Sequence, residues 1–130
     1  MTVRLMIVDD SAAIRGVYAR MLEDQPQIKI VASVGDPREA LKQIPAIKPD
    51  VVTLDVEMPG LTGLEALQQI RQIAPSTKVI MLSTLTNKGS KTSMEAERLG
   101  AAALLQKPGL GMNPSDFKRM FCAKLTQLVP

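Results

Sequence analysis

Histidine and tryptophan are absent from this 130-residue chain, which contains only one tyrosine, two phenylalanines and one cysteine. Without histidine, Ser-His-Asp and Cys-His catalytic mechanisms within this chain are excluded, and so is any histidine-ligated metal site. The single cysteine, Cys122, excludes an intramolecular disulfide, and its place on an apolar stripe indicates packing rather than reactivity. The shortage of aromatic residues also argues against stacking on nucleic-acid bases.

Long apolar runs are missing as well. No run approaches the roughly 20 residues that span a bilayer, and no apolar signal-peptide segment precedes the first strand pattern. We therefore expect a cytoplasmic protein that is neither exported nor inserted into a membrane, in keeping with its low cysteine content. The net charge of +3 is scattered from Arg4 to Lys124, so we interpret it as ordinary surface charge and expect no nucleic-acid partner.

What is present is an aliphatic composition, with 45% apolar and 22% charged residues, which is typical of a single folded domain covering residues 1–130. Short strand patterns alternate with helical patterns along the whole chain. Five consecutive βα units predict a three-layer, doubly wound α/β fold of the flavodoxin-like type, with a parallel sheet in the order 2-1-3-4-5. The predicted strands are Leu5–Val8, Ile28–Val34, Val51–Leu54, Val79–Leu82 and Ala102–Leu105.

Three helix starts carry local signals. Asp36-Pro37 supplies a cap and a first-turn proline, Thr62 to Glu65 has the spacing of a capping box, and Asn113-Pro114 precedes the last helix. That last helix has an amphipathic pattern, which predicts a face that closes the core. Its apolar stripe consists of Phe117, Met120, Phe121, Leu125 and Leu128.

Acidic residues follow two of the predicted strands at their carboxyl ends. Asp9 and Asp10 follow the first strand, and Asp55 follows the third. In the predicted order these two strands are neighbours at the switch point of the sheet, so the three carboxylates should meet in one crevice. An all-oxygen cluster suits a hard cation such as Mg²⁺, which takes one or two carboxylates together with waters and phosphoryl oxygens. The pattern therefore favours phosphate chemistry at Asp55.

Two further polar residues follow strands at the same edge. Ser83 comes directly after the fourth strand, and Lys107 follows the fifth. A lysine beside a phosphorylated carboxylate would neutralise phosphoryl oxygens, and a serine hydroxyl could donate a hydrogen bond to them.

Taken together, these motifs resemble the receiver domain of two-component response regulators over about residues 3 to 128. The segments that carry the resemblance are Val8-Asp9-Asp10-Ser11, Leu54-Asp55-Val56-Glu57-Met58-Pro59-Gly60 with Gly63, Leu82-Ser83, and Lys107-Pro108.

The resemblance implies a role for each strand-end residue. Asp55 would accept a phosphoryl group from a histidine kinase. Asp10, Asp55 and the backbone carbonyl of Glu57 would bind Mg²⁺, and Asp9 would act through a metal-bound water. Ser83 and Lys107 would hold the phosphoryl group, and the Lys107-Pro108 peptide bond would be cis. Before phosphorylation, we expect Lys107 to pair with the acidic cluster.

By the same resemblance, the face built from the fourth helix, fifth strand and fifth helix would transmit the signal. One departure is Leu104, because the family often has an aromatic residue three positions before the lysine. An aromatic gate that moves with Ser83 is therefore not expected in its usual form.

A narrower resemblance points to the receiver of the chemotaxis protein-glutamate methylesterase, CheB. It rests on Asp55 to Pro59, Met81 to Thr86, Lys88-Gly89-Ser90 and Lys107-Pro108. In that family the receiver inhibits a C-terminal esterase until it is phosphorylated, and the esterase uses serine, histidine and aspartate. Because histidine is absent, no esterase is expected in this chain. Two alternatives remain: a regulatory domain of a longer methylesterase, or a stand-alone receiver that acts by binding a downstream protein.

Two other classes of protein share parts of this pattern. An aspartyl-phosphate phosphatase of the haloacid-dehalogenase type also uses a strand-end aspartate and Mg²⁺, but it requires a second aspartate where this chain has Glu57. A flavodoxin shares the fold, but acidic residues follow the first strand here in place of a phosphate-binding loop. Beyond self-phosphorylation and self-dephosphorylation, no enzymatic activity is expected of this chain.

Overall fold

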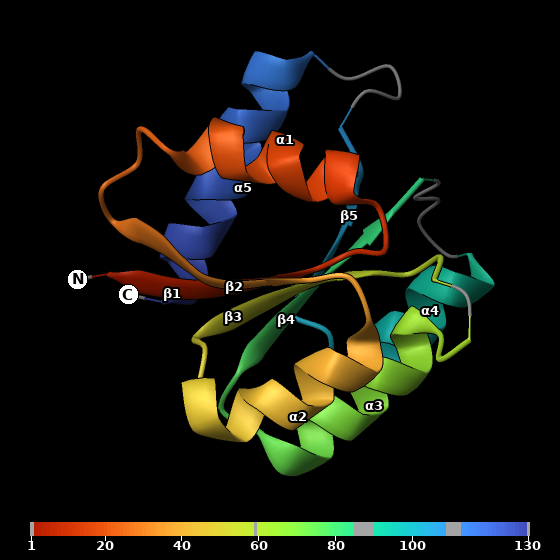
Figure 1. Cartoon of the computed structure of the whole chain (residues 1–130). Coiled ribbons are helices and arrows are strands. Elements are labelled where there is room, and N and C mark those ends of the chain that lie inside the picture. Colours follow the sequence, from red (N-terminus) through yellow and green to blue (C-terminus); the bar gives the residue numbers. More distant parts are fainter. Residues whose placement is uncertain (1, 59, 85–89, 109–112, 130) are drawn as a thin grey trace.

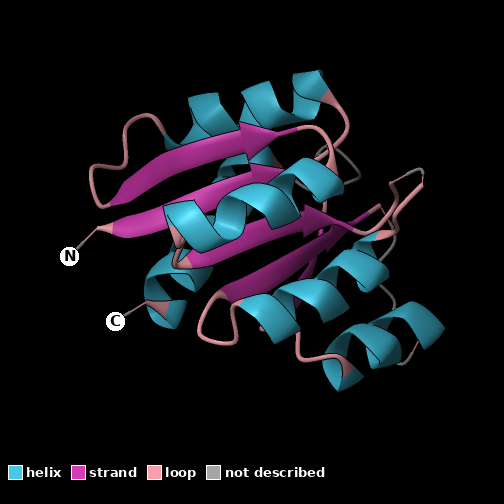
Figure 2. Ribbon diagram, turned by 60° about the horizontal axis from the view of Figure 1, so that its bottom comes forward, coloured by secondary structure: helices cyan, strands magenta, loops and turns pink. Residues whose placement is uncertain are grey.

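The computed structural model describes residues 2–58, 60–84, 90–108 and 113–129. Its core is one sheet of five parallel strands in the order β2-β1-β3-β4-β5, which confirms the predicted topology. Figure 2 shows the strands running in the same direction through the molecule. The strands are β1 Val3–Val8, β2 Ile28–Val34, β3 Val51–Asp55, β4 Lys78–Ser83 and β5 Ala103–Gln106.

Helices cover both faces of the sheet, so the fold has the three layers that the βα pattern predicts. Helices α1 and α5 lie on one face, and α2, α3 and α4 lie on the other (Figure 1). The start of β1 and the end of α5 lie at the opposite end of the sheet from the carboxyl end of β1 (Figure 1). The helices are α1 Ala12–Leu22, α2 Pro37–Ile47, α3 Gly63–Ile73, α4 Lys91–Arg98 and α5 Pro114–Leu128.

The bounds of β2 are those predicted, and the bounds of the other four strands differ from the prediction by one or two residues. β1 begins at Val3, two residues earlier than predicted, because the Val3 amide donates to the Gln27 carbonyl at 2.7 Å. β5 covers Ala103–Gln106, one residue later than predicted, and Gln106 pairs with Ser83 of β4. Pairing with the neighbouring strand, which hydropathy alone does not reveal, determines these ends.

The side chains of β1 alternate between two apolar cores. Met6 and Val8 pack with α2 and α3, whereas Leu5 and Ile7 pack with α1 and α5. The predicted apolar stripe of α5 forms part of the second core, where Phe117, Phe121 and Leu125 are fully buried. Met120, Cys122 and Leu128 are partly buried against it, so the predicted packing of Cys122 is also confirmed.

All three predicted helix starts are confirmed. The Asp36 side chain accepts from the Arg38 amide at 2.8 Å, and the Asn113 side chain accepts from the Ser115 amide at 2.8 Å. Thr62 and Glu65 form a reciprocal capping box at the start of α3. These caps satisfy amide groups that have no partner within the helix.

Gly63 allows α3 to begin directly against the end of β3. A Cβ atom at this position would lie 2.3 Å from the Asp55 carbonyl oxygen and 2.7 Å from the Val56 Cα atom. Both are backbone atoms, which cannot move aside as the end of a flexible side chain can. The close approach therefore requires glycine, and it fixes the backbone that carries Asp55.

Among the described residues, none of the helices combines the length and the apolar character needed to cross a membrane.

We predict that Gly63→Ala lowers the free energy of unfolding by at least about 2 kcal/mol, because the new methyl group overlaps backbone atoms of β3. Urea denaturation followed by circular dichroism measures the change. Gly16→Ala is the matched control: its Cβ would lie 3.4 Å from the end of the Arg20 side chain, and alanine favours a helix. That variant should be neutral or more stable. Equal stability of the two variants would contradict the close-packing interpretation.

Candidate functional site

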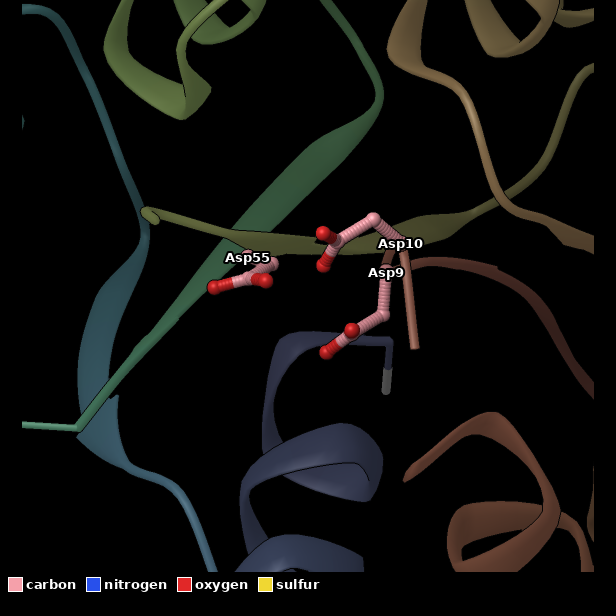
Figure 3. A group of neighbouring side chains, drawn as sticks. All are labelled: Asp9, Asp10 and Asp55. Carbon is pink, nitrogen blue, oxygen red and sulfur yellow. The ribbon is translucent and has the colours of Figure 1, made fainter. Parts of the chain in front are cut away.

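The carboxylates of Asp9, Asp10 and Asp55 come together at the carboxyl edge of the sheet, as predicted. One oxygen atom from each lies within 4.8 Å of the others. Figure 3 shows the side chains of Asp9 and Asp10, after β1, extending toward the side where Asp55 ends β3. The arrangement follows from the pairing of β1 with β3, which aligns Val8 with Leu54 and so brings the ends of the two strands together.

Two of these carboxylates are buried, and one is exposed. The exposed fractions of Asp9 and Asp55 are only 1% and 2%, whereas Asp10 faces solvent. Backbone amides compensate part of the burial: the Ser11 amide donates to Asp9 Oδ1 at 2.9 Å, and the Glu57 amide donates to Asp55 Oδ1 at 3.0 Å. The second oxygen of each buried carboxylate has no hydrogen-bond partner within the described part of the chain.

Lys107 supplies the positive charge at this edge. Its Nζ atom lies 2.7 Å from Asp55 Oδ1 and 3.7 Å from Asp9 Oδ2, so the predicted pairing with the acidic cluster is confirmed. The side chain is only 12% exposed, and the Lys107 amide donates to the Ser83 carbonyl at 2.8 Å, which ties the end of β5 to the end of β4.

The prediction of a cis bond between Lys107 and Pro108 is wrong for this structure. Both residues are described, and the backbone contains no cis peptide bond within the described ranges. The trans form is the lower-energy isomer of such bonds, and in this form the lysine side chain already contacts Asp55.

The electrostatics of the site are dominated by burial. Burial raises the pKa of the Asp9 carboxyl above its usual value. For Asp55, burial and the repulsion from Asp9 outweigh the hydrogen bond from Lys107 and raise the pKa to about 7. Burial alone would lower the pKa of Lys107, but its hydrogen bond and charge interaction with Asp55 raise it above its usual value. The site therefore has more negative charge than one lysine can balance.

This donor set fits a hard divalent cation. All three side chains offer oxygen atoms, and Asp9 Oδ2 and Asp55 Oδ2 are buried without a hydrogen-bond partner among the described residues. Buried carboxylate oxygens are normally hydrogen-bonded or bound to a metal ion. Charge, donor type and geometry all agree with the predicted Mg²⁺ site.

A cleft of about 280 Å³ opens beside the exposed carboxylate of Asp10. It lies between the start of α2 and the loop after β3, and Asp10 is the member of the acidic cluster that lines it. The lining residues are Asp10, Gly35, Asp36, Pro37, Arg38, Met58 and Gly60.

Ser83 also lies at this edge. Its hydroxyl contacts the side chain of Glu57, a residue whose backbone carbonyl alone was predicted to take part in the site. Ser83 Oγ donates to Glu57 Oε1 at 3.0 Å, and Thr84 donates to the same oxygen from its amide at 2.9 Å and from its hydroxyl at 2.5 Å. The contacts of the Glu57 side chain and of Thr84 were not predicted. The available signal was that Thr84 directly follows β4 and Glu57 comes two residues after the end of the neighbouring strand β3.

Comparison with known proteins identifies the family. The response regulator receiver domain family matches residues 5–114. This chain is a response regulator receiver domain. It is similar to protein-glutamate methylesterase/protein-glutamine glutaminase 1 of Paramagnetospirillum magneticum, with 49% identity over 98% of this chain. The match covers 34% of that relative, so the chain spans about one third of the relative's length.

Solved receiver structures agree with this assignment. The response regulator domain of Thermotoga maritima CheB has a TM-score of 0.88 and 37% identity, covering 98% of this chain and 96% of that one. A two-component response regulator of the LuxR family from Aurantimonas has a TM-score of 0.83 and 28% identity, covering 98% and 87%. These similarities support the narrower resemblance to methylesterase receivers. Residues 85–89, which carry part of that motif, lie outside the described residues.

We predict that Asp55→Asn makes this receiver domain more stable at pH 7.5 without divalent cations, by about 1 kcal/mol. The raised pKa of about 7 means that folded Asp55 holds a proton that the unfolded chain releases near pH 4. The wild-type protein therefore loses stability as the pH rises from about 4 to 7, whereas asparagine does not titrate and still offers Lys107 an oxygen.

Urea denaturation at several pH values measures this difference, which should shrink toward pH 5. Asp24→Asn is the control, because the hydrogen bond from Lys118 lowers the pKa of that exposed carboxyl. Removal of the Asp24 charge should bring no gain in stability. An Asp55→Asn variant that is less stable than wild type at pH 7.5 would contradict the predicted excess of negative charge.

Proposed function

We propose that this receiver domain is the phosphorylation-controlled switch of a chemotaxis-type two-component system, in which Asp55 accepts a phosphoryl group from a histidine kinase. The observation that supports the proposal most strongly is the contact of Asp55 with Lys107 at 2.7 Å inside a cluster of three carboxylates. Asp10, the exposed carboxylate of this cluster, also lines a cleft at the same edge.

In the proposed transfer, a carboxylate oxygen of Asp55 attacks phosphorus in line with the leaving nitrogen of the kinase phosphohistidine. The new phosphorus–oxygen bond forms as the phosphorus–nitrogen bond breaks, and the imidazole keeps the electron pair of that bond. Lys107 is placed to neutralise phosphoryl oxygens, and the hydrogen bond from the Glu57 amide orients the carboxylate. Positioning and electrostatics account for nearly all of such catalysis.

Asp10, Asp55 and the backbone carbonyl of Glu57 are the proposed ligands of Mg²⁺, with Asp9 acting through a bound water. The cation would balance the excess negative charge and offset the charge that develops on the transferring group. Asp9 and Asp10 contribute differently, since Asp9 is buried and Asp10 is exposed at the rim of the cleft.

The phosphoryl group adds close to two negative charges at the end of β3. We propose that Ser83 and Lys107 then hold it, and that their rearrangement alters the face built from α4, β5 and α5. The Lys107 amide is bonded to the Ser83 carbonyl, so a movement at the end of β4 is coupled directly to β5. Leu104 of β5 is partly buried against the core, where it can repack in place of an aromatic gate.

For the protein as a whole, we propose that this domain controls a C-terminal methylesterase, as the names of its relatives suggest. The alternative is a stand-alone receiver that binds a downstream protein. A haloacid-dehalogenase-type phosphatase is not supported. Such an enzyme needs a proton donor at the position of Glu57, whereas hydrogen bonds from Thr84 and Ser83 outweigh the effect of burial and lower the pKa of that carboxyl.

We predict that incubation with acetyl phosphate and Mg²⁺ adds one phosphoryl group to the wild-type protein, because Asp55 has the cation of Lys107 beside it and lies in a cluster that can hold Mg²⁺. Intact-mass spectrometry should show the adduct only with Mg²⁺, and Asp55→Asn should lack it. Asp24→Asn is the matched control: Asp24 is an exposed aspartate that pairs with Lys118, outside both the carboxylate cluster and the cleft. Stoichiometric labelling of Asp55→Asn would refute the assignment of the phosphoacceptor.

We also predict that Lys107→Ala slows phosphorylation by acetyl phosphate at least about tenfold, because it removes a cation from the reacting oxygens. Its Mg²⁺ affinity, measured by isothermal titration calorimetry, should be unchanged or higher, because the lysine no longer competes for the carboxylates. Lys118→Ala, which removes a surface lysine paired with Asp24, should behave as wild type. A wild-type rate in Lys107→Ala would remove the lysine from the mechanism.

A further inference from the structure

The Glu57 side chain links the ends of β3 and β4. Its Oε1 atom accepts from the Ser83 hydroxyl at 3.0 Å, from the Thr84 amide at 2.9 Å and from the Thr84 hydroxyl at 2.5 Å. The Ser83 hydroxyl and the Thr84 amide and hydroxyl thus form a group of three donors that binds one anionic oxygen. None of the roles proposed above uses this side chain, because only the backbone amide and carbonyl of Glu57 take part in them.

The position of this group brings it next to the phosphoacceptor. Glu57 follows Asp55 by two residues, and its amide donates to Asp55 Oδ1 at 3.0 Å. Strand pairing aligns Asp55 with Leu82, so Ser83 and Thr84 continue β4 just beyond the carboxyl end of β3. An anion attached to Asp55 and the Glu57 carboxylate therefore lie within reach of the same donors on β4.

We propose that the Glu57 carboxylate is a built-in competitor of the phosphoryl group: it holds Ser83 and Thr84 before phosphorylation and must release both afterwards. This inference rests on the proposed function of Asp55 and Ser83. It makes Glu57 a positioning residue that sets how readily the unphosphorylated domain changes to the phosphorylated form.

Two physical constraints lead to this competition. A serine hydroxyl has one proton, so it donates to one strong acceptor at a time, and here that acceptor is Glu57. A phosphoryl group brings close to two negative charges beside a carboxylate that already accepts three charge-assisted hydrogen bonds. Repulsion between the two anions then favours release of Glu57, and the Ser83 hydroxyl becomes available to the phosphoryl oxygens.

The test measures binding of beryllium trifluoride, an anionic analogue of the phosphoryl group, in the presence of Mg²⁺. We expect Glu57→Ala to bind the analogue about five- to tenfold more tightly than wild type, because the competing acceptor is gone. Glu57→Gln removes the same charge but keeps an acceptor oxygen, so its gain should be smaller. Thr84→Val loses one of the three donors and should show a gain of about twofold.

The variants separate competition from simple charge removal. If Glu57 acts only through its charge, Glu57→Ala and Glu57→Gln will tighten binding equally, and Thr84→Val will have no effect. If Glu57 competes for the donors, the gain from Glu57→Ala will be smaller in the Thr84→Val background. Equal gains in the two backgrounds would overturn the proposal. Titration with Mg²⁺ alone measures the change in metal affinity, which is subtracted for each variant.

A second readout follows the donor itself. In wild type, the Thr84 amide signal in nuclear magnetic resonance spectra should move on analogue binding toward its position in Glu57→Ala. An unmoved Thr84 signal in a protein that binds the analogue would overturn the competition and leave the phosphoacceptor assignment intact. Failure of wild type to bind the analogue with Mg²⁺ would instead overturn the role of Asp55, and the competition with it.

Discussion

The structure depends on one electrostatic conflict, the burial of Asp9 and Asp55 against the single cation of Lys107. Parallel pairing of β1 with β3 makes this crowding unavoidable, since it aligns the two strand ends. Burial and repulsion from Asp9 raise the pKa of Asp55 to about 7, because they disfavour the ionised form more than Lys107 stabilises it. A protein optimised only for stability would not keep such a cluster. The same crowding of carboxylates underlies the proposed binding of Mg²⁺ and the proposed phosphoryl transfer at this edge of the sheet.

The surrounding backbone is arranged to tolerate that charge. The amides of Ser11 and Glu57 each donate to one buried carboxylate, and each leaves the other oxygen of that carboxylate available. Gly63 lets α3 pack against the Asp55 backbone with no intervening side chain, which holds the end of β3 in place. The two apolar cores on either face of the sheet hold the strands that carry these groups. Packing of the apolar cores thus offsets the unfavourable electrostatics at the edge of the sheet.

The edge of the sheet contains two anionic centres rather than one. The cluster around Asp55 faces Lys107, and the Glu57 carboxylate faces the hydroxyls and amide at the end of β4. Because the Lys107 amide also bonds to the Ser83 carbonyl, strands β3, β4 and β5 are linked by polar contacts at their ends. In the proposed switch, a change of charge at Asp55 would act on this connected set of hydrogen bonds, without an aromatic side chain to transmit it.

The sequence by itself determined the fold, the caps and the identity of the strand-end residues. Alternating hydropathy identified the five strands, Thr62 with Glu65 identified the start of α3, and Asp55 was identified by its place after a buried strand. These features are local, so composition and spacing are enough to predict them. The tertiary structure alone decided the contacts that depend on distance: the pairing of Glu57 with Ser83 and Thr84, the close approach at Gly63 and the trans bond at Lys107. The first two depend on how neighbouring strand ends pack, and the third is a choice between isomers of similar energy. Neither packing nor isomer choice leaves a periodic pattern in the sequence.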